Sequence, residues 1–176
     1  GEYEAGMNRA LEVADWDGFE LRTEESAERG LCRGISIANY IEVTSGIPRE
    51  RAELTVCTDG SIELVVGTMS SGQGHETSFP QLVAQWLEVP FDAIRFVVND
   101  TDRVSVGGGS HSGRSMRLVS ICVGQAVEAL IDKAKAIAAH MLQTSADEVN
   151  YAYGQLTTTA GASIALADAA READSS

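Results

Sequence analysis

Two segments rich in glycine and serine carry the residues of this sequence that are best suited to hold a ligand. The first, residues 67–77, contains the run Gly72-Gln73-Gly74, and the second, residues 107–115, lies in the most glycine-dense part of the chain. A strand-like pattern precedes each segment and a helix-like pattern follows it. The first turn of a helix has backbone N–H groups without partners and a partial positive charge. Two converging helix starts would therefore suit a phosphorylated or otherwise anionic cofactor.

The same two segments are also compatible with a purely structural role as connections between strands and helices. Neither G-x-x-x-x-G-K-[ST] nor G-x-G-x-x-G occurs, so the common nucleotide-binding motifs are absent. Arg114 and Arg117 are able to hold phosphate oxygens, and His75 and His111 are available as polar contacts to a ligand. On local physics alone, the structural role is favoured over ligand binding.

Two other kinds of site are disfavoured by residue spacing. His75, His111 and His140 are far apart in the sequence and lack the close spacing of local zinc motifs. Ser71, His75 and Asp100 supply the residue types of a hydrolytic triad, but no G-x-S-x-G elbow is present. Neither a three-histidine metal centre nor a serine hydrolase is expected.

Charge and composition restrict the class of partner. The chain has 26 Asp and Glu residues against 13 Lys and Arg, which gives a formal net charge of −13. This charge repels phosphate backbones and anionic lipid surfaces, so no nucleic acid partner and no membrane partner is expected. Hydrophobic residues make up 44% of the chain, and no apolar run reaches the roughly 20 residues of a membrane-spanning helix. The sequence predicts a soluble globular domain.

The cysteines and the N-terminus indicate the cellular compartment. Cys32, Cys57 and Cys122 are widely spaced and form no C-x-x-C pair, so we expect reduced, mostly buried thiols in a cytoplasmic protein, and no iron-sulfur cluster in this chain. The N-terminus lacks the basic and apolar segments of a secretory signal. It also lacks an initiator methionine, which suggests an excised piece of a longer chain.

The strands that lead into the two loops follow from hydrophobic alternation. Residues 52–58 and 61–68 alternate as strands around Asp59-Gly60, a pair typical of a tight hairpin turn. Residues 94–100 have the pattern of a buried strand that enters the second loop. A further β-type run is expected over residues 35–43.

The helices that follow the two loops have separate signals. Ser78 with Gln81 matches a capping box and Pro80 suits a first turn, so a helix is expected over residues 79–87. Residues 116–142 contain no proline, and their first half is apolar nearly all round. This predicts a long, central and buried helix.

The remaining elements complete an α+β fold in which a β-hairpin or mixed sheet packs against a long buried helix and shorter helices. We expect a short helix over residues 3–16, a turn or helix over 23–28, a capped turn over 145–148, a hairpin over 149–161 and a last helix over 164–172. The expected divisions are an N-terminal flank, 1–33, a core segment, 34–143, and a hairpin with a C-terminal helix of the same domain, 144–176.

Three stretches resemble the cofactor-binding part of the molybdenum hydroxylases, the xanthine dehydrogenase and aldehyde oxidase family. They are GTMSSGQGHETSFPQLVAQWLEVP, IRFVVNDTDRVSVGGGSHSGRSMR and VGQAVEAL. Together they match the family's Gly-Gln-Gly turn with a following Thr, its Asp-Thr-Asp after a strand, its Gly- and Ser-rich loop with Arg, and its long helix. Within the family they look most like the large subunit of the bacterial carbon monoxide dehydrogenase type. The likeness is strong over residues 33–142.

The resemblance implies which residues would bind the cofactor. The Gly-Gln-Gly turn would contact the pterin, with the Gln side chain acting as donor and acceptor, and the second loop would lie against the pterin where it enters the long helix. Many relatives read Gly-Ser-Arg where this chain reads Ser-Gly-Arg. Substitution of Gln73 or Arg114 is expected to lower cofactor occupancy more than folding stability. The residues so implied are Gly72, Gln73, Gly74, Ser112, Gly113, Arg114, Ser115 and Met116.

The resemblance also implies a function for the longer protein. By this resemblance, the present chain would be part of the large subunit of a molybdenum-cofactor-dependent oxidoreductase that oxidises carbon monoxide, an aldehyde or an N-heterocycle with water as the oxygen source. The cofactor would be a molybdenum-pyranopterin, in the molybdopterin cytosine dinucleotide form. Iron-sulfur clusters and FAD would lie on an iron-sulfur subunit and a flavin subunit, within a higher-order oligomer.

No catalytic residue and no metal ligand is assigned within this chain. The family's glutamate base and substrate-covering loop match no residues here, so the isolated fragment is expected to be inactive. The alternative is a non-catalytic α+β interaction module whose glycine loops are only connections.

Overall fold

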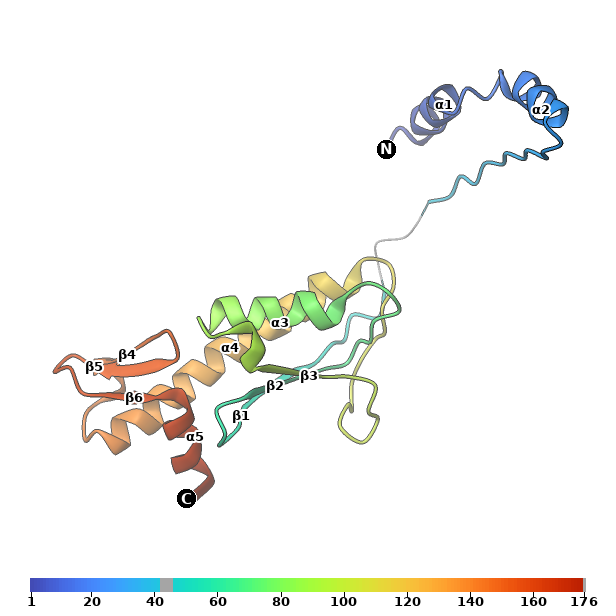
Figure 1. Ribbon diagram of the computed structural model, residues 1–176. Coiled ribbons are helices and arrows are strands. Elements are labelled where there is room, and N and C mark those ends of the chain that lie inside the picture. The colour runs from blue at the N-terminus through green and yellow to red at the C-terminus, as the bar shows by residue number, and fades with distance from the viewer. Residues whose placement is uncertain (42–45, 176) are drawn as a thin grey trace. The chain divides into compact units, whose positions relative to one another are not determined.

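The computed structural model describes residues 1–41 and 46–175 (Figure 1). By internal contacts the chain divides into two compact units, Gly1–Glu42 and Val43–Ser176. Each unit is described by itself. Both candidate loops belong to the second unit.

The first unit contains two helices, α1 (Tyr3–Val13) and α2 (Phe19–Glu28), in its described residues. Both agree with the sequence patterns. Arg22 on α2 closes the turn between them, because its Nη2 donates to the carbonyl oxygens of Ala14 at 3.0 Å and Asp15 at 2.7 Å.

The β-type run predicted over residues 35–43 is not a strand where the structure describes it. Residues 34–41 are without regular structure, and Ile37, Tyr40 and Ile41 are exposed. The described part of the first unit offers no neighbouring strand, and a strand needs one to satisfy its backbone groups. Glu42 and Val43, the end of the predicted run, lie outside the described residues.

A mixed sheet forms the base of the second unit. It has the order β1 (Ala52–Val56), β2 (Ile62–Val66) and β3 (Ile94–Val97). Strands β1 and β2 are antiparallel, as the hairpin signal predicted, whereas β2 and β3 are parallel. The prediction that β3 is buried is wrong, because β3 is an edge strand and its residues are half-buried or exposed.

The hairpin between β1 and β2 confirms the reading of Asp59-Gly60. An Asp59 carboxylate oxygen accepts hydrogen bonds from the Ser61 N–H at 2.9 Å and the Ser61 hydroxyl at 2.6 Å. Gly60 has a φ of 89°, which a residue with a side chain rarely adopts.

Helix α3 (His75–Trp86) connects β2 to β3 and begins four residues before the predicted start. Its N-cap is Gly74, in the left-handed conformation, so the predicted capping box at Ser78 does not form. The Ser78 hydroxyl instead donates to the Gly74 carbonyl oxygen at 3.2 Å, and Pro80 lies inside the helix. The backbone of the glycine turn, rather than a side-chain cap, sets the start.

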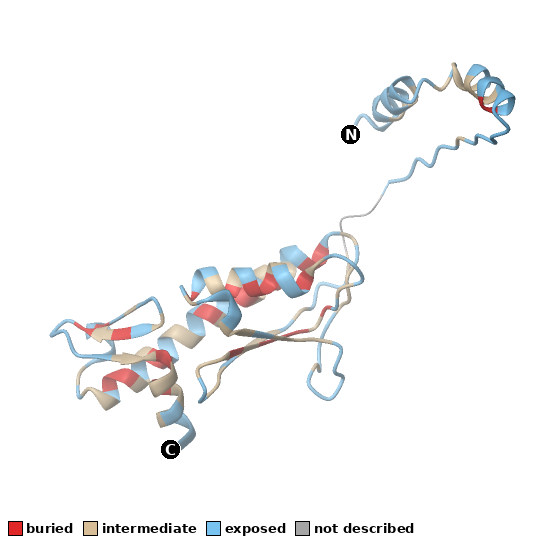
Figure 2. Cartoon of the chain, in the orientation of Figure 1, coloured by how far each residue is buried: buried red, intermediate tan, exposed pale blue. Residues whose placement is uncertain are grey.

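Helix α4 (Arg114–Met141) is the long helix that the sequence predicted, starting two residues earlier. It packs on β1 and α3 packs on β3, so the two helices lie side by side over the sheet (Figure 1). Val119, Val123 and Val127 are among its buried residues, and Figure 2 shows buried segments along the helices. The predicted burial holds for one face of the helix only, because Met116 and Ile121 in its first half are exposed.

A second sheet packs against the C-terminal part of α4 (Figure 1). It comprises β4 (Val149–Ala152), β5 (Gln155–Thr158) and β6 (Ser163–Ala165), all antiparallel. The turn between β4 and β5 has positive φ at Tyr153 and Gly154, the pattern of a type I′ turn. The three-residue β6 was not predicted. Two short 3₁₀-helices, η1 (Phe91–Ala93) and η2 (Ala146–Glu148), precede β3 and β4. Helix α5 (Leu166–Ser175) is the last element of the unit.

The fold class is confirmed as α+β. The cysteine prediction needs correction: all three thiols are free, but Cys32 is exposed while Cys57 and Cys122 are partly buried. Cys32 lies in the irregular segment after α2, where no core surrounds it. Within the part of the chain that the structure describes, no helix has the length and apolarity needed to cross a bilayer.

Candidate cofactor-binding site

The two candidate loops meet because they leave neighbouring parallel strands. Strands β2 and β3 point the same way, so the segments that follow them emerge at one edge of the sheet. Gly67 and Gly107 touch there through their backbones. A Cβ added to Gly107 would lie 1.9 Å from the Gly67 carbonyl oxygen, and one added to Gly67 would lie 2.2 Å from the Val106 carbonyl oxygen. Two glycines are therefore required for this contact.

Each loop ends in a helix whose N-cap is a glycine with left-handed backbone. Gly74 precedes α3 with φ 74° and ψ 32°, and Gly113 precedes α4 with φ 65° and ψ 8°. Because glycine has no side chain, neither N-cap residue offers a side-chain acceptor to the backbone N–H groups in the first turn of its helix. Helix starts of this kind leave backbone N–H groups for a ligand.

A pocket of about 380 Å³ lies between the two helix starts. It joins the first loop and α3 to the second loop and the first turn of α4. Five of the residues predicted to bind cofactor line it, whereas Gly72, Gly74 and Arg114 do not. Its lining comprises Gln73, His75, Ser78, Ser110, His111, Ser112, Gly113, Ser115 and Met116.

The pocket wall is rich in hydrogen-bonding groups. It presents serine hydroxyls, two imidazoles and one amide, and none of the described residues that line it is acidic. In a chain with a net charge of −13, this distribution leaves the pocket suited to a ligand with many acceptor oxygens. Nowhere in residues 1–41 and 46–175 do three or more His, Cys, Asp or Glu side chains gather to hold a metal ion.

Gln73 is oriented by its own loop. Its side-chain oxygen accepts a hydrogen bond from the Ser71 N–H, and the Ser70 hydroxyl accepts one from the Gly74 N–H at 3.1 Å. One lone pair of the Gln73 amide oxygen is therefore used within the loop, which leaves the second lone pair and the NH₂ group available for a ligand.

Ser115 joins the second loop to the sheet. Its hydroxyl lies 3.1 Å from the hydroxyl of Thr68, and both residues are buried. Thr68 directly follows Gly67, so this bond fixes the first turn of α4 beside the end of β2. The sequence gave no signal for the pair, because its members are 47 residues apart.

Arg114 is buried beneath the second loop and does not line the pocket. Its Nε donates to the Ile47 carbonyl oxygen at 2.9 Å, and its Nη2 donates to the Arg49 carbonyl oxygen at 2.7 Å. Its Nη1 donates to Gly109 at 2.7 Å and to the Glu50 carboxylate at 2.8 Å. The reading of Arg114 as a charge for phosphate oxygens is therefore corrected, since its side chain holds residues 47–50 and the loop together.

His75 is a pocket residue that the sequence marked only as one polar contact among several. It is 4% exposed, and its ring stacks on Phe79 with centroids 4.7 Å apart. The Nδ1 atom is buried without a hydrogen-bond partner.

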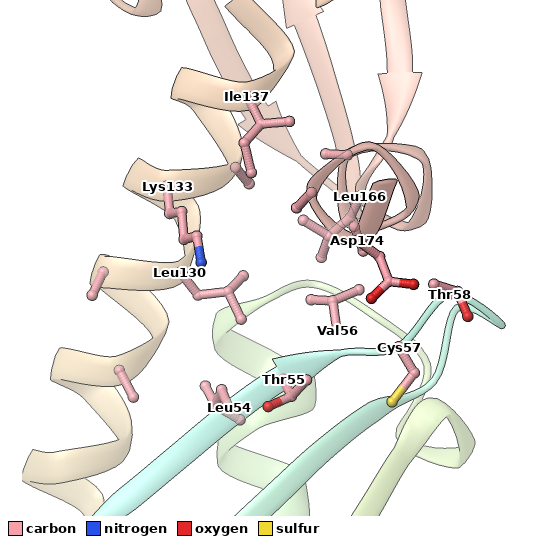
Figure 3. Close-up of a pocket in the computed structure, with 16 residues that line it drawn as sticks. Leu54, Thr55, Val56, Cys57, Thr58, Leu130, Lys133, Ile137, Leu166 and Asp174 are labelled. Carbon is pink, nitrogen blue, oxygen red and sulfur yellow. The ribbon is translucent and has the colours of Figure 1, made fainter. Parts of the chain in front are cut away.

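A larger cavity of about 720 Å³ lies elsewhere, between β1, α4 and α5 (Figure 3). Leu54, Val56, Leu130, Ile137 and Leu166 give it a largely aliphatic wall. None of the predicted cofactor-binding residues lines it. The smaller polar pocket is therefore the candidate site.

Comparison with protein families gives one match along nearly the whole chain. A model described as a molybdopterin cofactor-binding domain matches residues 9–176. This range contains every residue of the polar pocket.

Curated relatives are similar at low identity. The carbon monoxide dehydrogenase large chain of Afipia carboxidovorans is 29% identical over 170 residues, 86% of this chain and 21% of the relative. That of Hydrogenophaga pseudoflava is 26% identical over 167 residues, 86% of this chain and 20% of the relative. The nicotine 6-hydroxylase large subunit of Paenarthrobacter nicotinovorans is 26% identical over 150 residues, 78% of this chain and 18% of the relative. This chain thus spans about a fifth of their length.

Solved structures show the same fold. A Cu,Mo-CO dehydrogenase in its carbon monoxide reduced state superposes with a TM-score of 0.66 at 24% identity, over 96% of this chain and 24% of that one. Quinoline 2-oxidoreductase from Pseudomonas putida 86 superposes with a TM-score of 0.62 at 22% identity, over 99% of this chain and 24% of that one.

Proposed function

This chain belongs to the family of molybdopterin cofactor-binding domains, and from that premise we propose that its polar pocket holds the pterin of a molybdenum cofactor. The observation that carries the proposal is the meeting of two glycine-capped helix starts around one pocket whose described lining residues include no acidic side chain. The fit is supported by the donor set of the wall and by the unpartnered Nδ1 of His75.

The residues divide into contacting and positioning groups in this proposal. Gln73 donates its NH₂ group, while Ser112 and Ser115 offer hydroxyls, and Gly113 and Met116 present the start of α4. These five line the pocket and contact the cofactor.

Three other residues position that wall. Gly72 and Gly74 supply the positive φ values of the first turn, 104° and 74°. Arg114 acts from beneath, through its buried hydrogen bonds.

The proposal extends to the longer protein as an oxidoreductase large subunit. The bound cofactor supplies the two-electron redox chemistry at molybdenum, and the chain supplies binding and orientation. We infer the cytosine dinucleotide form of the cofactor, FAD and iron-sulfur clusters on partner subunits, and a cytoplasmic oligomer. Carbon monoxide, an aldehyde or an N-heterocycle is the proposed substrate, since relatives are named for carbon monoxide and nicotine.

The test is the cofactor content of the full-length protein purified with its partner subunits. We expect molybdenum, measured by plasma mass spectrometry, and pterin, measured by fluorescence after oxidative release. Gln73→Ala should lower the molybdenum and pterin contents about tenfold, because it removes an amide group that donates a hydrogen bond to the cofactor. Gln81→Ala is the matched control, since Gln81 is exposed on α3 and does not line the pocket.

Two results would contradict the proposal. Wild-type protein without molybdenum and pterin, produced in cells that supply the cofactor, would favour the interaction module. Unchanged cofactor content in Gln73→Ala would remove the first loop from the site.

A further inference from the structure

His75 occupies a position where its polar character has no structural use. It is the first residue of α3, in the wall of the pocket between the two helix starts. Its ring stacks on Phe79 at an interplanar angle of 30°, and Phe79 packs in turn against Phe96 at 6.1 Å. An apolar ring would satisfy this packing equally well.

The Nδ1 atom of His75 is an exception among the buried polar atoms. Within residues 1–41 and 46–175 it is the only buried side-chain nitrogen or oxygen without a hydrogen-bond partner. Burial has removed the hydrogen bonds of this atom to water without replacing them, and this destabilises the fold. A bound ligand is one of the few arrangements that would compensate this loss.

The pocket wall supplies the setting for such a ligand. Gln73 is oriented by Ser71, and Ser115 is fixed by Thr68, so two of the flanking groups are held in place before a ligand binds. The imidazole of His75 adds two ring nitrogens, each able to take part in a hydrogen bond, to this wall.

We propose that a ring nitrogen of His75 forms a hydrogen bond with the bound pterin cofactor, so that the stack on Phe79 serves to orient a ligand-contacting group. This inference rests on the proposed function of the pocket. It assigns to His75 a contact that packing alone does not require, and a bond to Nδ1 would also give that atom the partner that it lacks in the cofactor-free protein.

The experiment compares three variants of the full-length protein purified with its partner subunits. His75→Phe keeps an aromatic ring but removes both nitrogens. His75→Asn and His75→Gln each restore a polar amide, near the positions of Nδ1 and Nε2. The readouts are molybdenum and pterin content, the rate of pterin release during dilution, and the thermal unfolding midpoint of the cofactor-free protein.

We expect His75→Phe to release pterin about tenfold faster than wild type, the effect of one lost hydrogen bond. The unfolding midpoint of its cofactor-free form should be unchanged or higher, because the unpartnered buried nitrogen is gone. One of the two amides should restore the release rate to within about threefold of wild type. His140→Phe is the control, since His140 is exposed at the last turn of α4 and should release pterin at the wild-type rate.

Three results would overturn the inference. Wild-type release from His75→Phe would show that the ring only packs. A lower unfolding midpoint of cofactor-free His75→Phe, together with pterin loss, would assign the loss to the fold. If neither amide variant restored the wild-type rate of pterin release, the pterin loss would be assigned to the shape of the ring. Wild-type protein lacking molybdenum and pterin would instead refute the proposed function itself, so the two failures are distinguishable.

Discussion

Arg114 and Glu50 form a buried ion pair, with Nη1 and Oε2 2.8 Å apart and side chains 0% and 1% exposed. Backbone carbonyl oxygens of three other residues accept the remaining bonds of the guanidinium. Gly108 makes room for it, because a Cβ there would lie 2.5 Å from Arg114 Cζ. The pair therefore fastens residues 47–50 and the second loop to the first turn of α4.

Arg114→Met should destabilise the protein by about 3–5 kcal/mol, because it leaves the buried Glu50 carboxylate without a compensating charge. This reverses the order expected from sequence, in which cofactor occupancy falls more than stability. The measurement is urea unfolding of the purified protein. Arg95→Met is the control, since Arg95 and Asp59 form an exposed pair that should contribute less than about 1 kcal/mol. Equal losses from the two variants would contradict a structural role for the buried pair.

Gly107→Ala should displace the second loop, since its Cβ would overlap the Gly67 carbonyl oxygen. We expect a loss of more than about 2 kcal/mol in unfolding free energy, by overpacking, and lower pterin content in the full-length protein. The matched control is Gly124→Ala within α4. There the new Cβ meets the Trp86 ring at 3.7 Å, an ordinary contact, and alanine favours the helix by up to about 1 kcal/mol. A wild-type unfolding curve for Gly107→Ala would contradict this prediction, because it would show that separating the two loops leaves the unfolding free energy unchanged.

Tyr151 joins the second sheet to the end of α3, because its hydroxyl donates to the Leu87 carbonyl oxygen at 2.6 Å. Burial raises the pKa of Tyr151 from 10 to about 12, and the negative charge of Glu88 adds to the shift. The folded state therefore favours the neutral phenol. Its contribution to stability is fully present below pH 10 and is lost as the pH rises through about 12.

Comparison of wild type with Tyr151→Phe isolates this contribution. At pH 8 we expect the variant to be less stable by about 1 kcal/mol, the value of one hydrogen bond, and the difference should shrink above pH 10. Urea unfolding between pH 8 and pH 11 measures it. Tyr153→Phe, at an exposed turn, should stay within about 0.5 kcal/mol of wild type. A difference that grows with pH would contradict the sign of the pKa shift.

Local patterns along the sequence were sufficient for most elements of the second unit. Asp59-Gly60 predicted the hairpin because turn conformation is decided by neighbouring residues. The proline-free stretch 116–142, apolar nearly all round in its first half, predicted α4 because helix periodicity is local as well. The combined glycine loops also indicated the family. The run at residues 35–43 failed because a strand depends on a partner that local sequence does not specify.

The tertiary structure alone decided how the loops form a site. The contact of Gly67 with Gly107 depends on β2 and β3 being parallel neighbours, and the pairing of Arg114 with Glu50 joins residues 64 positions apart. Periodicity contains no information about such contacts, because they arise when packing brings distant segments together. For the same reason, the sequence identified His75 as a polar residue near a loop. Only the tertiary structure shows its burial against Phe79 with Nδ1 left unpartnered, the observations on which its proposed contact with a ligand rests.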